Sequence, residues 1–122
     1  VDISEHACAK WGHELRDIAT WKPSKRFDLV IYHGVLHYLD EPAAVSAIAN
    51  LGAATRNVLY LELPTAHDLA EVVDPELTDM DVHHRSGEWY RSRLNVHFQQ
   101  AGAGLWVRHS TVPLYELESA QP

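Results

Sequence analysis

Two short, almost continuous apolar runs constrain the fold of this chain more than any other feature. They span residues 27–32 and 58–63 and are rich in leucine, β-branched and aromatic side chains. A strand that is apolar on both faces is typical of the buried interior of a parallel sheet. We therefore expect two neighbouring parallel strands, the second of them ended by Pro64.

The segment between these runs predicts a helix. Asp40 is a good N-cap, Pro42 falls in the first turn, Val45 and Ile48 lie on one face, and Gly52 falls near the end. Strand, helix and strand in this order predict a βαβ unit, and such crossovers are almost always right-handed.

Shorter elements are expected before the first run. Ser4 can cap a helix over residues 5–11, which places residues 1–3 at the exit of an earlier strand, and a very short second strand is expected just before Asp17. Because the chain opens at Val1, within what reads as the end of a strand, we expect the first strand and first helix of the domain to be missing.

The second half of the chain predicts a long loop, a helix and a hairpin. Residues 66–87 are polar and acidic, which indicates a lid or substrate-binding loop. Ser86 introduces a helix whose apolar spacing continues to Gly102. Residues 105–118 predict an antiparallel hairpin around residues 111–113.

The order of these elements predicts one partial domain over residues 1–122. Its expected class is α/β: a Rossmann-like, doubly wound and mostly parallel sheet with an antiparallel C-terminal hairpin. In such sheets ligands bind beyond the carboxyl ends of the strands.

Composition narrows the classes of partner. The net charge is −7, and the ten Lys and Arg residues are scattered, which argues against nucleic acid because its binding needs clustered positive charge. No apolar run is long enough to cross a bilayer, so no membrane partner is expected. A single cysteine, Cys8, excludes an internal disulfide framework and suits a cytoplasmic location. A small molecule is the expected partner.

Two carboxylates and a His-Gly pair fall at predicted strand ends. Asp2, Asp17 and the pair His33 and Gly34 would all lie along one edge of the sheet. A carboxylate there can accept hydrogen bonds from both hydroxyls of a ribose, and a second one can accept from the amine of adenine. Glycine lets the backbone approach a ligand closely. This pattern favours a nucleoside site.

In the order and spacing of these elements the chain resembles class I S-adenosylmethionine-dependent methyltransferases. The resemblance rests on residues 1–4, 17–18 and 27–30 running into 35–39, and the terminal segment 88–118 resembles that family's last helix and antiparallel strands. It implies methyl transfer from S-adenosylmethionine to a small-molecule acceptor. The family's glycine-rich loop is absent from this chain.

The resemblance also implies roles for particular residues. Those implied to bind the cofactor are Asp2 and Ile3 at the ribose, Asp17 and Ile18 at the adenine, and His33, Gly34 and His37 at the methionine part.

A cluster of histidine, arginine and aromatic residues in and after the long loop is the candidate acceptor site. Its catalytic candidates are His83, His84, Tyr90 and Arg91. Histidine is the natural base when the acceptor carries a proton, because its ordinary pKa is near 6.5. A guanidinium, from Arg85 or Arg91, would suit an acceptor with a carboxylate.

Other functions fit the same pattern. The first is a non-catalytic interaction domain that completes its sheet with a partner chain or in a homodimer. The second is a nucleotide-sugar or dinucleotide enzyme on the same architecture. A metal site is not expected, because His33 and His37 have no third ligand at matching spacing.

Several of these residues also have an ordinary structural interpretation. Asp2 and Asp17 can be turn or capping residues, His83 and His84 a solvated pair, and Trp89 and Tyr90 part of the core.

Overall fold

The computed structural model describes residues 5–12, 14, 16–78 and 80–114. Its helices and strands follow the chain in the order α1 (Glu5–Trp11), β1 (Phe27–His33), α2 (Glu41–Ala54), β2 (Thr55–Glu62), α3 (Gly87–Leu94), β3 (Phe98–Gly102) and β4 (Leu105–Arg108). A 3₁₀ turn, η1 (Leu36–Tyr38), precedes α2, and a π-helical turn, η2 (Asp68–Val72), follows β2. The strand end expected at residues 1–3 and the part of the hairpin expected at residues 115–118 lie outside the described residues.

The predicted βαβ unit is confirmed. β1 and β2 pair in parallel, with Val30 opposite Leu59 and His33 opposite Glu62, and α2 connects them. The side chain of Asp40 caps α2, because its Oδ1 accepts a hydrogen bond of 2.9 Å from the backbone N–H of Ala43.

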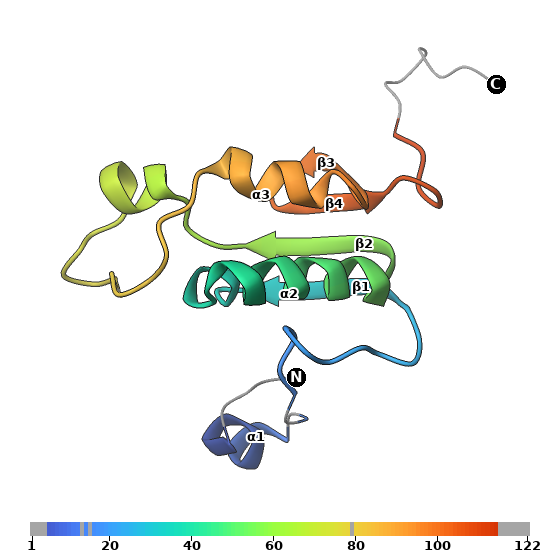
Figure 1. Cartoon of the computed structure of the whole chain (residues 1–122), viewed down its shortest axis with the longest axis horizontal. Helices are drawn as coiled ribbons and strands as arrows, with labels where there is room; N and C mark the ends of the chain where they lie inside the picture. Colours follow the sequence, from blue (N-terminus) through green and yellow to red (C-terminus); the bar gives the residue numbers. More distant parts are fainter. Residues whose placement is uncertain (1–4, 13, 15, 79, 115–122) are drawn as a thin grey trace.

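The described sheet is mixed rather than mostly parallel. Its strand order is β1-β2-β4-β3, and both pairs that involve β4 are antiparallel (Figure 1). The chain is thus an α/β protein with one parallel pair. The C-terminal hairpin supplies the rest of the sheet, since β4 lies directly beside β2.

The prediction of a helix from Ser86 to Gly102 is wrong in its second half. Ser86 caps α3 as expected, with its Oγ accepting from the N–H of Trp89 at 3.1 Å, but the helix ends at Leu94. Phe98–Gly102 forms β3 instead, because pairing with β4 satisfies the backbone groups of this segment. The apolar residues of this segment continue the helical spacing of α3, but the segment is not helical.

An antiparallel C-terminal hairpin is present, but β3 and β4 form it, rather than residues 105–118. The chain reverses at Ala103 and Gly104, whose φ angles are 53° and 80°. Two consecutive positive φ angles are typical of a tight hairpin turn, and glycine adopts them without strain. A Cβ on Gly104 would also lie 3.1 Å from the carbonyl oxygen of Leu61. Residues 111–113, where the turn was predicted, lie beyond β4.

The short strand expected before Asp17 is not formed by the residues described there. Asp17 makes a turn instead: its Oδ1 accepts from the N–H of Ala19 at 2.9 Å, and its carbonyl accepts from Trp21 at 2.7 Å. Such local hydrogen bonds offer the backbone an alternative to a strand ladder.

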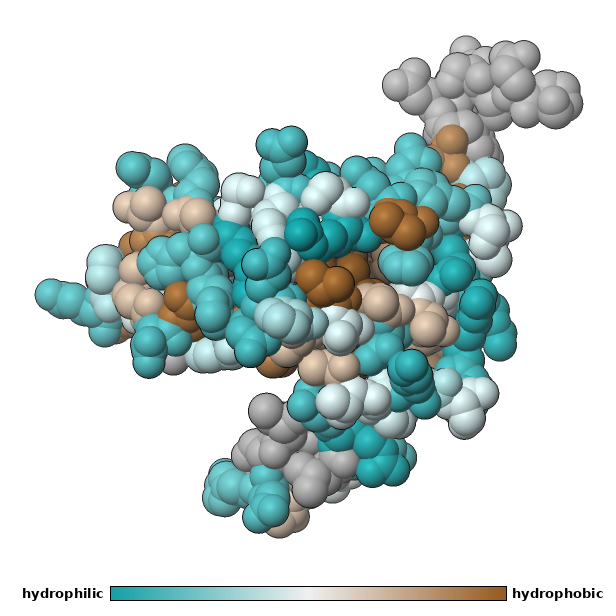
Figure 2. All heavy atoms as spheres, viewed as in Figure 1, coloured by the Kyte–Doolittle hydropathy of each residue, from teal (hydrophilic) through white to brown (hydrophobic). Residues whose placement is uncertain are grey.

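Helices α2 and α3 pack on the same face of the sheet. The core contains Ile48 and Leu51 of α2, Leu94 of α3, and Leu59 and Trp106 of the strands, all less than 5 % exposed. Figures 1 and 2 view the molecule with α2 in front of β1, and this side of the molecule is mostly hydrophilic. We call the face that carries this core the covered face.

The opposite face carries apolar side chains that remain accessible. Leu29 and Ile31 of β1 are 55 % and 66 % exposed, and Leu105 of β4 is 39 % exposed. By register, these residues flank Val58 and Tyr60 of β2. We call this the open face. Separately, none of the helices in the described ranges is long and apolar enough to cross a membrane.

Candidate functional site

A pocket of about 390 Å³ lies at the carboxyl ends of the two parallel strands. His33 and Glu62 come from the ends of β1 and β2, while Gly34 and His37 come from the segment after β1. Leu63, Pro64 and residues of the segment that follows complete the wall. The sequence predicted this placement for His33, Gly34 and His37, and the structure brings these three together.

Gly34 turns the chain away from the sheet. Its φ is +67°, in the left-handed region that favours glycine, and a Cβ there would meet no atom within 4 Å. Its N–H donates to the carbonyl of Glu62 at 2.8 Å, which fixes the end of β1 to the end of β2. The turn leads into η1, where His37 is 6 % exposed and its ring lies 4.4 Å from that of Tyr38.

Glu62 forms the polar edge of the pocket and was not among the predicted residues. Its carboxylate lies 3.3 Å from Nε2 of His33 and accepts a 2.8 Å hydrogen bond from the hydroxyl of Tyr60. The hydrogen bond and the negative charge of Glu62 raise the pKa of Tyr60 above its ordinary value. A carboxylate in the last position of an apolar strand is the sequence signal that could have identified Glu62.

The far wall of the pocket begins with a capping box. The Oγ1 of Thr65 accepts from the N–H of Asp68 at 3.3 Å, and the carboxylate of Asp68 accepts from the N–H of Thr65 at 2.9 Å. This exchange starts the helical turn that carries Val72 and Val73 to the pocket. The ends of the long loop are also joined, because the N–H of Ala66 donates to the carbonyl of Arg85 at 2.6 Å.

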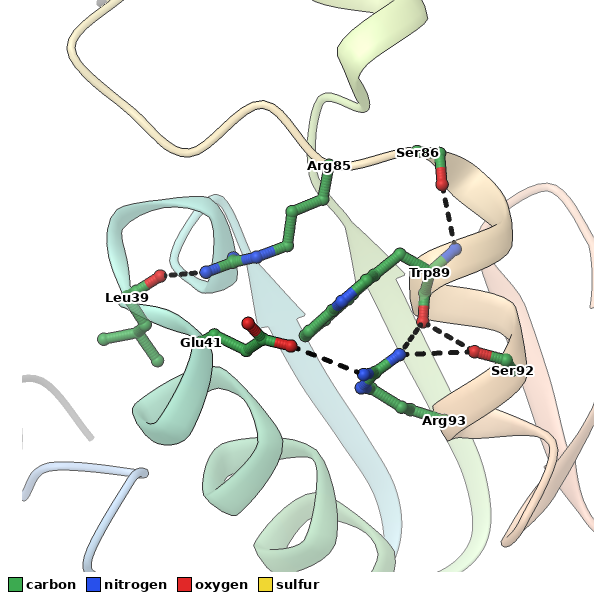
Figure 3. A network of polar contacts seen from close by, with 7 residues as sticks. All are labelled: Leu39, Glu41, Arg85, Ser86, Trp89, Ser92 and Arg93. Atoms are coloured by element: carbon green, nitrogen blue, oxygen red, sulfur yellow. Dashed lines mark hydrogen bonds and ion pairs between the residues drawn. The ribbon is translucent and has the colours of Figure 1, made fainter.

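Arg85 holds the turn that carries His37, and it does not face a ligand site. Arg85 is buried, and its guanidinium donates to the carbonyls of Leu36 and Leu39 and lies 4.8 Å from the ring centre of Trp89. Figure 3 shows the contact with Leu39 and the neighbouring ring of Trp89. The expectation that Arg85 could bind a substrate carboxylate is therefore wrong. Arg93 packs on the same ring at 3.8 Å and reaches Glu41 of α2 (Figure 3).

The predicted catalytic residues are divided between two places. His83 and His84 are exposed and do not line the pocket at the strand ends, although the N–H of His83 donates to the carbonyl of His37 at 2.8 Å. Tyr90 and Arg91 line a second, smaller pocket of about 130 Å³ between α3 and the sheet.

Of the residues implied to hold the nucleoside, the two that the structure describes, Asp17 and Ile18, do not line the pocket at the strand ends. Asp2 and Ile3 lie outside the described residues. Asp17 is exposed, while Ile18 is a core residue whose carbonyl accepts from the amide of Asn50 at 2.7 Å. Burial, and secondarily the charge of Asp17, raise the pKa of Tyr32 far above its ordinary value.

The described residues contain one more hollow and no cluster of metal ligands. A hollow of about 520 Å³ is larger than either pocket, but it lies at the amino end of β1, between Phe27 and the segment from Gly12 to Lys25. No group of three or more potential metal-ligating side chains occurs in the described part of the chain.

Comparison with models of known protein families, with curated protein sequences and with solved structures gives no match.

Proposed function

We propose that this chain binds S-adenosylmethionine in the pocket at the carboxyl ends of β1 and β2 and belongs to an enzyme that methylates a small molecule. The observation that carries the proposal is the meeting of His33, Gly34 and His37 in that pocket. These are the residues that the resemblance to class I methyltransferases assigns to the methionine part of the cofactor. A Rossmann-like arrangement of the complete sheet is part of the same proposal.

The pocket suits the amino-acid end of such a cofactor. Its volume, about 390 Å³, falls in the range of about 300–1,000 Å³ that is usual for small-molecule sites. Glu62 supplies carboxylate oxygens that can accept hydrogen bonds from an ammonium group. Leu63, Val72 and Val73 give the pocket an apolar wall for the carbon chain.

For methyl transfer the protein mainly has to position the cofactor and the acceptor. The sulfonium of S-adenosylmethionine supplies the activated methyl group, so the chain's own residues need only orient cofactor and acceptor in line and exclude water. Where the acceptor carries a proton, His83 is the candidate base. Its side chain is exposed and lines neither pocket, but its backbone N–H donates to the carbonyl of His37, which places it beside the proposed cofactor pocket.

Calorimetric titration of the folded chain with S-adenosylhomocysteine tests the proposal. We expect saturable binding that weakens about tenfold in Glu62→Gln, because a charge-assisted hydrogen bond to the ligand is lost. Asp28→Asn is the matched control: Asp28 lies at the other end of the parallel pair, where it contacts Arg56, and its loss should leave binding unchanged. A folded chain that does not bind, or that binds NAD more tightly, contradicts the proposal.

The alternative function, an interaction domain that completes its sheet with a partner, is favoured by one observation. In the described sheet β1 has a neighbour on one side only, and its open-face residues Leu29 and Ile31 are more than half exposed. Sedimentation equilibrium of the purified chain discriminates: a monomer over the whole concentration range argues against self-pairing, and a stable dimer supports it.

A further inference from the structure

The smaller pocket has an apolar interior. Leu61 belongs to β2 and Leu63 follows its end, Trp106 comes from β4, and Leu94 comes from α3. Its volume is about 130 Å³. A cavity of about 150 Å³ with similar apolar walls accommodates benzene, so this pocket can take a phenyl ring or a short branched alkyl group.

Tyr90 places an unsatisfied hydroxyl group at this pocket. Its side chain is only 3 % exposed, and the hydroxyl has no hydrogen-bond partner among the described residues. Burying a hydroxyl without a partner is destabilising, and native structures rarely keep one. A ligand with a hydrogen-bond acceptor would satisfy it.

Arg91 lies one residue further along α3 and supplies positive charge. Its side chain is exposed and lines the same pocket, with its guanidinium packed against Gly87, where an added Cβ would lie 2.8 Å from Nη1. Arg56 and Arg93 are ion-paired, whereas within the described residues no ion pair is found for Arg91. Of the described residues that line the pocket, Arg91 is the one with a charged side chain.

We propose that this pocket binds a small carboxylic acid with an apolar body. The body would occupy the space between Leu61, Leu94 and Trp106, and the carboxylate would accept hydrogen bonds from the hydroxyl of Tyr90 and the guanidinium of Arg91. Guanidinium and carboxylate match in geometry and charge. An amine would instead bring a second positive charge to Arg91.

The position of the pocket connects this ligand to the proposed reaction. Leu63 lines both pockets, so the acid would lie next to the proposed cofactor site. The acid is therefore assigned as the methyl acceptor: a carboxylate oxygen would form a bond to the methyl carbon as the bond from that carbon to sulfur breaks, which gives a methyl ester and neutral S-adenosylhomocysteine. This assignment rests on the proposed function, whereas the binding of the acid does not.

Titration of the full chain with isovalerate in the millimolar range, followed by ¹H–¹⁵N NMR, tests the binding site. We expect saturable shifts of the Trp106 indole and Gln100 side-chain signals, both of which belong to residues that line the pocket. Affinity should fall about tenfold in Arg91→Gln and about threefold in Tyr90→Phe. Arg56→Gln, which removes an exposed arginine outside the pocket, should bind like the unaltered chain.

Three results would overturn the proposal: absence of saturable shifts, equal binding of isovaleramide, or equal binding of inorganic phosphate, which would indicate an unselective anion site. Titration with S-adenosylhomocysteine is carried out separately. Isovalerate binding without S-adenosylhomocysteine binding supports the acid site and refutes its role as acceptor site. Cofactor binding without isovalerate binding refutes the acid site and leaves the proposed function intact.

Discussion

The two faces of the sheet are built from the same strands but differ in how they are covered. On the covered face, Leu59, Phe98 and Trp106 are 0 %, 0 % and 4 % exposed beneath α2 and α3. On the open face, Leu29 and Ile31 are 55 % and 66 % exposed. Both sets are equally apolar in the sequence.

This difference shows that the hydrophobicity of a strand does not decide which of its faces is buried. Both long helices pack on one side, so the stabilising burial of apolar surface is concentrated there. The two pockets that carry the functional proposals lie at strand ends and under α3, where the covered layer meets solvent. Four measurements test how far this contrast between the faces holds.

The largest expected effect is on the covered face. Phe98→Ala should lower the free energy of unfolding by about 3–5 kcal/mol, because a fully buried aromatic ring is replaced by a cavity. Urea unfolding followed by circular dichroism measures it. A loss below about 1 kcal/mol would mean that the core between α3 and the sheet is not close-packed.

Arg85→Gln should cost about 2 kcal/mol, since the carbonyls of Leu36 and Leu39 lose a charged donor in a buried place. Thermal unfolding checks the loss of stability, and calorimetry with S-adenosylhomocysteine should show weaker binding, because His37 lies on the same turn. Arg93→Gln, which removes a more exposed contact to Trp89, is the control and should change both quantities less. Equal effects of the two variants would refute a positioning role for Arg85.

A smaller effect concerns pH. Burial, then the charge of Arg108, then His109, lower the pKa of His97, whose ring packs against Gly52 of α2. The unfolded chain therefore binds a proton more readily at this site, and stability should fall as pH decreases from about 6.5 toward the lower pKa of the folded state. His97→Gln should flatten this part of the profile of unfolding free energy against pH. An unchanged slope would assign the pH dependence to other histidines.

The smallest expected effect is on the open face. Ile31→Thr should change the free energy of unfolding by less than about 0.5 kcal/mol, because its side chain is already largely exposed. Unfolding at two protein concentrations is the appropriate measurement. A larger loss that grows with concentration would show that a second copy covers this face and would favour the interaction domain over the isolated enzyme domain.

Local signals predicted part of this fold correctly. Asp40, Pro42 and the two apolar runs act through their immediate neighbours, and the βαβ unit that they indicated is present. The hairpin turn was misplaced because apolar residues up to Phe98 continue the helical spacing of α3. The positive φ angles around Gly104 set the position of the turn. Such a turn makes a hairpin only when the strands on its two sides pair, as β3 and β4 do.

The site was predictable to a similar extent. His33, Gly34 and His37 follow directly from the end of a predicted strand. Glu62 joins them only through the register of β1 and β2, which places it opposite His33. Arg85 reaches Leu36 across 49 residues, and no local pattern reveals such a contact.

Leu63 has a consequence for any pair of ligands that occupy the two pockets it lines. A side chain shared by both walls can adopt only one arrangement at a time, so a ligand that moves Leu63 in one pocket would alter the shape of the other. Thermodynamic linkage then makes the influence mutual: whatever factor the first ligand imposes on the affinity of the second, the second imposes on the first. Substitution of Leu63 by alanine should therefore uncouple the two equilibria.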